Sequence, residues 1–99
     1  MTREDAEALI GRVCRNEVGL GFTDHFWVQA GKRFPGLQRQ QVYNILRRGR
    51  VVDAPVRDGI HRNHTVKVRA TLPDFGPVEL VAAVSDDSGL FCITIYGLQ

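Results

Sequence analysis

The sequence predicts an α+β domain in which N-terminal helices pack on one face of a roughly four-stranded antiparallel sheet. Apolar residues recur at helical spacing in the first half of the chain, and the spacing changes to two from Val51 onward. Helices that precede a run of strands are typical of the α+β class. Because 99 residues is one domain's length, we expect a single domain over residues 1–99.

The first predicted helix begins after Thr2, which with Asp5 forms a weaker relative of the capping box. Its apolar positions follow at helical spacing: Ala6, Leu9, Ile10, Val13 and Cys14. It ends in residues 16–21, where an asparagine and two glycines supply the positive φ that turns require.

A second helix is predicted from Thr23 or Asp24 to about Phe34, with Phe26, Ala30 and Phe34 on its apolar stripe. The stripe one residue earlier is polar. It consists of His25, Gln29 and Arg33, which therefore share a face other than the core face.

Pro35 and Gly36 separate this helix from a third, which has Leu37 near its start and Gly49 as its C-cap. Its buried set is Val42, Ile45 and Leu46. Its other face interleaves an aromatic ring with guanidinium groups, as nucleic-acid surfaces do: Arg39, Tyr43, Arg47 and, just past the helix, Arg50. A solvated helix end, favoured by the helix dipole, explains these arginines equally simply, and on this helix alone we prefer it.

The strand region begins with a clean alternation over Thr65–Leu72, which places Lys67 and Arg69 on one face together. After a turn at 73–77, strands are predicted at Val78–Ser85 and Leu90–Tyr96, joined by a hairpin loop at 86–89. On the last strand, two-residue alternation predicts one side made of Phe91, Ile93 and Ile95, and the other of Leu90, Cys92, Thr94 and Tyr96.

The net charge of +2 conceals a strong division along the chain. Residues 1–31 carry three basic and five acidic residues, residues 32–69 carry ten basic and two acidic, and residues 70–99 carry four acidic and no basic ones. A centre of +8 between acidic ends favours a polyanion-binding surface over a merely solvated one.

Several function classes lack their signatures. The chain has no phosphate-binding loop, dinucleotide fingerprint, CxxC pair or HExxH, and we predict neither a cofactor nor a metal. The HRNH segment lies where a loop enters a strand, so we interpret His61, Arg62 and His64 as two surface histidines beside an arginine, or as helpers in anion binding. With no signal peptide or membrane span, we expect a cytoplasmic protein whose Cys14 and Cys92 are buried thiols.

Metal-free RNA cleavage needs a group that accepts the 2′-hydroxyl proton, a donor for the leaving oxygen, and cations for the phosphate. If the polar face of the second helix meets a sheet edge, residues of these types gather there: His25, Arg33, Lys67, Arg69, Thr94 and Tyr96. Taken singly, each is more simply explained as a packing or capping residue.

The segment FTDHFWVQAGKRFPGLQRQQVYNILRRGRVVD, together with the closing CITIYG, resembles a family of small, largely uncharacterised bacterial proteins. That family is grouped with the ribonuclease toxins of the RelE, barnase, EndoU and colicin type. The resemblance implies helices packed on a four-stranded antiparallel sheet, with His25, Arg33, Thr94 and Tyr96 at active-site positions. Members often carry a second arginine four residues after the histidine, where this chain has Gln29.

We therefore expect a toxin-like, metal-independent RNA endonuclease of a toxin–antitoxin or mobile-element system, with His25 as acid or base. Lys67 and Arg69 would grip the phosphate with Arg33. RNA is the expected partner, and a small antitoxin or another protein would cover the basic face. The alternative is a non-catalytic RNA- or protein-binding module of the same fold, such as a degenerate toxin or a phage-encoded inhibitor. The oligomeric state is left open.

Overall fold

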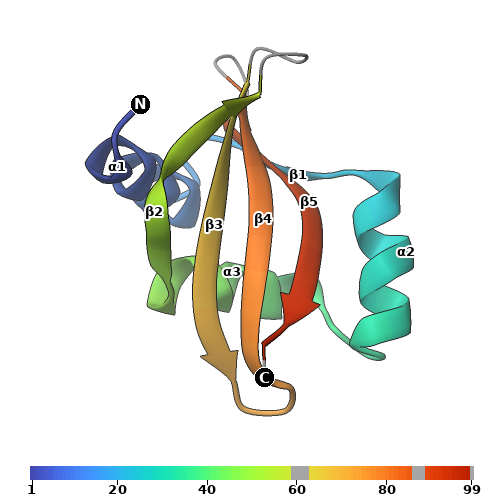
Figure 1. Cartoon of the computed structure of the whole chain (residues 1–99). Helices are drawn as coiled ribbons and strands as arrows, with labels where there is room; N and C mark the ends of the chain where they lie inside the picture. The colour runs from blue at the N-terminus through green and yellow to red at the C-terminus, as the bar shows by residue number, and fades with distance from the viewer. Residues whose placement is uncertain (59–62, 86–88, 99) are drawn as a thin grey trace.

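The computed structural model describes residues 1–58, 63–85 and 89–98, which form three helices and five strands (Figure 1). Their order along the chain is α1 (Arg3–Cys14), β1 (Leu20–Phe22), α2 (Asp24–Arg33), α3 (Arg39–Arg48), β2 (Arg50–Asp58), β3 (Asn63–Leu72), β4 (Gly76–Ser85) and β5 (Gly89–Gly97). The α+β class and the order of helices before the main sheet are as predicted. The predicted loop at 86–89 lies, apart from Gly89, outside the described residues.

The sheet has the order β1-β5-β4-β3-β2 and is mixed. Strands β2 to β5 form the predicted antiparallel meander, but β1 adds a fifth strand that runs parallel to β5. The prediction of about four strands, all antiparallel, is therefore wrong at this edge. Leu20–Phe22 is too short to show an alternation, and its first two residues lie inside the segment 16–21 that the sequence predicts as a turn. The turn prediction is wrong for Leu20 and Gly21; earlier in the segment, Asn16 has a φ of 60°.

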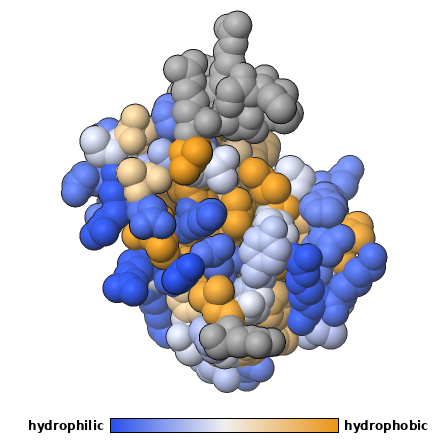
Figure 2. All heavy atoms as spheres, in the orientation of Figure 1, coloured by the Kyte–Doolittle hydropathy of each residue, from blue (hydrophilic) through white to orange (hydrophobic). Residues whose placement is uncertain are grey.

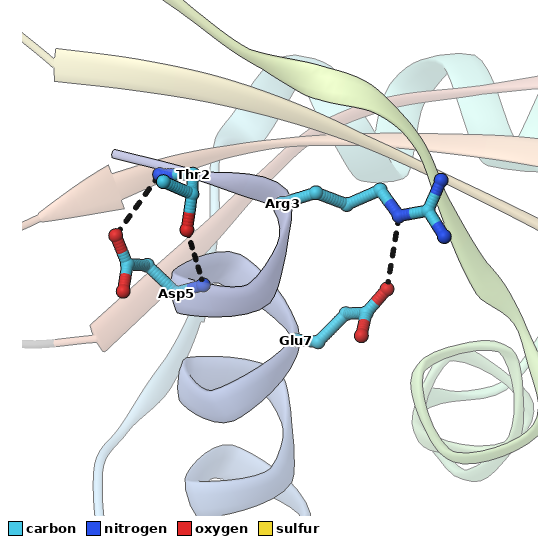
Figure 3. A network of polar contacts seen from close by, with 4 residues as sticks. All are labelled: Thr2, Arg3, Asp5 and Glu7. Atoms are coloured by element: carbon cyan, nitrogen blue, oxygen red, sulfur yellow. Dashed lines mark hydrogen bonds and ion pairs between the residues drawn. The ribbon is translucent and has the colours of Figure 1, made fainter.

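The start of α1 is fixed by a capping box (Figure 3). Thr2 Oγ1 accepts a hydrogen bond from the Asp5 backbone N–H at 3.1 Å, and the Asp5 carboxylate accepts from the Thr2 N–H at 2.9 Å. These hydrogen bonds, the backbone one foremost, hold the pKa of Asp5 below its ordinary value. Elsewhere on the first two turns of α1, Arg3 Nε and Glu7 Oε1 form an ion pair at 3.3 Å (Figure 3).

The other two helices also begin and end close to the predicted residues. Thr23 caps α2, accepting from the Phe26 N–H at 3.1 Å, and Phe34 closes it. Helix α3 begins at Arg39 behind the N-cap Gln38 and ends at Gly49. Within the described ranges no helix combines the length and the apolar character needed to cross a membrane.

Helices α1 and α3 lie against one face of the sheet, whereas α2 lies beside β5 (Figure 1). The core fills the space between the helices and the sheet. It includes Val13 of α1, Ile45 of α3 and Phe26 of α2, all with almost no exposed surface. The sheet contributes alternate side chains: Val66, Val68, Leu80, Ala82, Leu90 and Ile95.

A β-bulge in β5 changes which side chains share a face. Val81 is opposite Thr94 while the next residue, Ala82, is opposite Cys92, so Ile93 is an extra residue. The predicted grouping of Ile95 with Phe91, and of Thr94 and Tyr96 with Cys92, is therefore wrong. Ile95 joins Leu90 and Cys92 in the core at 0% exposure, and Tyr96, on the opposite face, is 43% exposed.

Candidate functional site

The sheet face away from α1 and α3 carries no helix among the described residues, and we call it the open face (Figures 1 and 2). In Figure 2 hydrophilic side chains are spread over this face, with apolar surface between them. The strand register arranges its side chains in rows across the sheet, and two of these rows contain Lys67, Arg69 and Glu79. The first row is Arg50, Arg69, Glu79 and Tyr96, and the second is Val52, Lys67, Val81 and Thr94.

The first row contains a buried carboxylate. Glu79 is only 9% exposed, and its Oε1 accepts a hydrogen bond from Arg69 Nε at 3.0 Å. Lys67 is its diagonal neighbour on the next strand, a position from which a long side chain reaches. Sequence reasoning missed Glu79, although one signal was present. It is the only acid in the apolar strand segment VELVAAV, and it alternates with the core residues Val78 and Leu80.

Arg33 reaches β5 from the last turn of α2. Its Nη1 donates to Thr94 Oγ1 at 3.2 Å and to the Ile95 carbonyl oxygen at 3.0 Å. Its guanidinium carbon lies 4.9 Å from the centre of the Tyr96 ring. Arg33, Thr94 and Tyr96 are thus brought together. Because β1 pairs with β5 only as far as Cys92, the rest of that strand edge is free for α2 to cover.

His25 lies in the first turn of the same helix and is exposed. It shares a helix face with Arg33, but eight residues at 1.5 Å each separate the two Cα atoms by about 12 Å along the axis. Among the contacts of the described residues, none joins His25 to Arg33, Thr94 or Tyr96. Three of the four predicted catalytic residues, Arg33, Thr94 and Tyr96, therefore lie together, and His25 lies apart from them.

The residues predicted to bind nucleic acid on the third helix lie on the other side of the sheet from Lys67. Arg39 Nη2 donates to the Leu20 carbonyl oxygen at 3.2 Å, and its guanidinium lies against Tyr43. Arg47 lines a groove of about 500 Å³ between α1, α3 and the start of β2, with Arg50 at the rim. Arg50 also stands in register with Arg69, so it lies where the two sides meet.

The HRNH residues are only partly described. His61 and Arg62 lie outside the described residues. His64 is opposite the core residue Val84 and lies two residues before the core residue Val66 on the same strand. Because residues two apart share a face, His64 lies on the helix-covered face, on the other side of the sheet from Lys67. Among the described residues predicted to bind nucleic acid, Arg50 and Arg69 lie in the first row of the open face, and Lys67 lies in the second.

No three or more metal-ligating side chains cluster within residues 1–58, 63–85 and 89–98. Comparison with models of protein families, with curated proteins and with solved structures gives no match for the chain. The resemblance to the ribonuclease toxins therefore stays a prediction.

Proposed function

We propose that the chain is a toxin-like, metal-independent RNA endonuclease of a toxin–antitoxin or mobile-element system that cleaves on the open face. The observation that carries the proposal is the buried carboxylate of Glu79, held by Arg69 on a sheet face that no described helix covers. A carboxylate in that position has to serve some purpose, because an apolar residue there would avoid the cost of burying a charge.

The surrounding charges suit a phosphodiester. Lys67 and Arg69 are exposed beside Glu79, and Arg33 stands at the far end of the row against Tyr96. A guanidinium group can donate two parallel hydrogen bonds to the oxygens of one phosphate, and a lysine ammonium adds a point charge on a flexible side chain. Cations so arranged would stabilise the extra negative charge that develops on phosphorus during attack by the 2′-hydroxyl.

The residues of the first row can complete the proton transfers. Glu79 accepts the proton of the 2′-hydroxyl, whose oxygen then attacks phosphorus, and the bond from phosphorus to the 5′-oxygen breaks. Tyr96 donates a proton to the departing 5′-oxygen. The products are a 2′,3′-cyclic phosphate and a 5′-hydroxyl, and water carries the proton from Glu79 back to Tyr96. We assign the base to Glu79 rather than to His25, because Glu79 adjoins the cations and His25 lies at the other end of α2.

The test is cleavage of a single-stranded RNA oligonucleotide in the presence of EDTA, with the product ends identified by mass. Glu79→Gln keeps the shape of the side chain and removes its basicity, so it should slow cleavage about 10²–10⁴-fold. His25→Ala should change the rate by less than about threefold under the same conditions. Glu4→Gln, which removes an exposed carboxylate on α1, is the matched control and should cleave as the parent chain does. An inactive parent chain, or full activity in the Glu79 variant, would overturn the proposal.

A non-catalytic RNA-binding module is the second candidate. Two observations favour it: Arg33 already donates two hydrogen bonds within the chain, and Gln29 brings no charge to the same helix face. This candidate predicts that the parent chain binds single-stranded RNA without cleaving it. Glu79→Gln should then bind RNA more tightly than the parent, because a negative charge is removed from the open face.

A further inference from the structure

A row of neighbouring planar side chains, tilted against one another, lies away from the open face. The Trp27 and Phe22 rings have centroids 4.9 Å apart, and the Arg39 guanidinium carbon lies 5.1 Å from the Phe22 centroid. The same guanidinium lies 6.0 Å from the Tyr43 centroid. We call these four residues the aromatic ladder. It joins α2, β1 and α3, and Phe22 and Tyr43 pack on their inner sides against the core to which these segments contribute.

The ladder is accessible in part along its length. Trp27 keeps 37% of its surface exposed, Arg39 is exposed, and Phe22 and Tyr43 are half-buried. The fully buried ring of Phe26 packs edge-on against Trp27 at 5.0 Å and ties that end of the ladder to the core. Rings held in place and partly open to solvent lose little freedom when a further planar group stacks on them.

The charge around the ladder points to an anionic partner. Helix α3 contains three arginines and no acidic residue: Arg39 at the ladder, and Arg47 and Arg48 at the end of the helix. None of the three takes part in an ion pair among the described residues. Glu7 lines the same groove as Arg47, where it pairs with Arg3 instead, and Asp74 lines a pocket with Arg48 without an ion pair between the two.

We propose that the aromatic ladder, continued by Arg47 on the same face of α3, binds single-stranded nucleic acid by stacking, at a site separate from the cleavage site. Aromatic faces accept any base, and neighbouring cations follow the backbone, which is how proteins hold single strands without reading their sequence. The inference rests on the proposed function for RNA as the ligand. It adds a place on the other side of the sheet that holds the strand outside the reacting nucleotides.

The experiment uses the full chain and a single-stranded dodecamer of deoxyadenylate, which lacks the 2′-hydroxyl and cannot be cleaved by the proposed reaction. Trp27 is the only tryptophan, so its fluorescence reports on the ladder alone. Binding of the labelled dodecamer is followed separately by anisotropy. We expect the tryptophan fluorescence to be quenched with the same midpoint as the anisotropy change. Oligonucleotide binding that leaves Trp27 fluorescence unchanged overturns the inference.

Variants separate the ladder from the open face. Tyr43→Leu keeps an apolar side chain on α3 and should weaken binding of the dodecamer about fivefold or more. Arg47→Gln changes only an exposed side chain and should also weaken it, whereas Arg12→Gln on α1 is the charge-matched control and should not. Lys67→Gln with Arg69→Gln should impair RNA cleavage and leave the quenching of Trp27 in place.

These results distinguish failure of the ladder from failure of the proposed enzyme. If the parent chain cleaves RNA while Tyr43→Leu and Arg47→Gln bind the dodecamer as the parent does, the enzyme proposal stands and the ladder site is overturned. A chain that quenches normally but never cleaves retains the ladder and loses the enzyme. If no nucleic acid binds at all, and a protein from the same genome protects Trp27 instead, the ladder is a protein contact and the inference is wrong.

Discussion

Strands β3 and β4 send alternate side chains into two different environments. On the helix-covered face, Val68 and Leu80 are in register and have at most 1% of their surface exposed. One residue further along β3 and one residue earlier along β4, Arg69 and Glu79 are also in register and form an ion pair on the open face. The same backbone therefore holds an apolar core on one side and charged groups on the other.

The two faces tolerate different substitutions. A core side chain is held by close packing, and its removal leaves a cavity that the surroundings fill only in part. An open-face side chain is held mainly by its partner and by water, so its chemistry can change while the fold persists. Because the core packs against the other side of the same strands, it holds the backbone of a site on the open face in place.

The largest expected effect comes from truncating a core side chain next to an open-face one. Leu80→Ala should lower the free energy of unfolding by about 2–5 kcal/mol. Glu79→Gln, one residue earlier, should lower it by less than about 1 kcal/mol, because its partner Arg69 is half exposed. Urea unfolding followed by circular dichroism measures both. Equal losses for the two variants would show that the open face is as tightly packed as the core.

Much of this two-faced arrangement could be predicted from the sequence. The run Thr65–Leu72 alternates without interruption, and the structure follows it residue by residue, with Lys67 and Arg69 projecting together. The helices were predictable for a similar reason, because their caps and apolar stripes are local features. Information carried by neighbouring residues was therefore sufficient for these elements.

The errors arise where contacts between distant segments decide the outcome. The bulge at Ile93 depends on how β5 aligns with β4, and alternation within β5 alone predicts the wrong faces for Thr94 and Tyr96. Strand β1 forms only because β5 offers it an edge. Glu79 was overlooked for the related reason that its partner, Arg69, lies on another strand.

The junction between the two faces at the β5 edge can be tested through Arg33. Arg33→Lys keeps the charge but loses the planar group that lies on Tyr96 and donates to the Ile95 carbonyl. We expect a loss of about 1.5 kcal/mol, the lower end of the range for a hydrogen bond to a charged group, because Arg33 is exposed. Urea unfolding measures the loss, and Lys32→Arg, the reverse change at the preceding residue, is the control. A loss no greater than in that control would show that the edge does not depend on the guanidinium.

A smaller effect is expected for the charges of the open face. Each phosphate contact with a single strand contributes about 0.7 to the slope of log affinity against log salt concentration. Lys67→Gln with Arg69→Gln should therefore reduce that slope for RNA by about 1.4. Because Arg69→Gln leaves the buried Glu79 carboxylate without its ion-pair partner, the urea midpoint should fall further than it does in the exposed Arg12→Gln. Filter binding between about 50 and about 200 mM salt gives the slope. An unchanged slope would remove these two cations from the RNA interface.

The smallest effect compares the two thiols, one in the core and one at the groove. Burial raises the pKa of the Cys92 thiol to about 12, with a lesser opposing influence from Arg39. The native state therefore holds this proton more tightly than the unfolded chain, whose thiol titrates near 9.0. The contribution of the protonated Cys92 thiol to the free energy of unfolding is fully present below about pH 9 and falls as the pH rises toward about 12. Between about pH 8 and about pH 9.5 the loss in that free energy should therefore stay below about 1 kcal/mol. Cys92→Ala should lack this part of the alkaline decline while Cys14→Ala retains it, and equal declines in the two variants would show that the Cys92 proton is not held by the core.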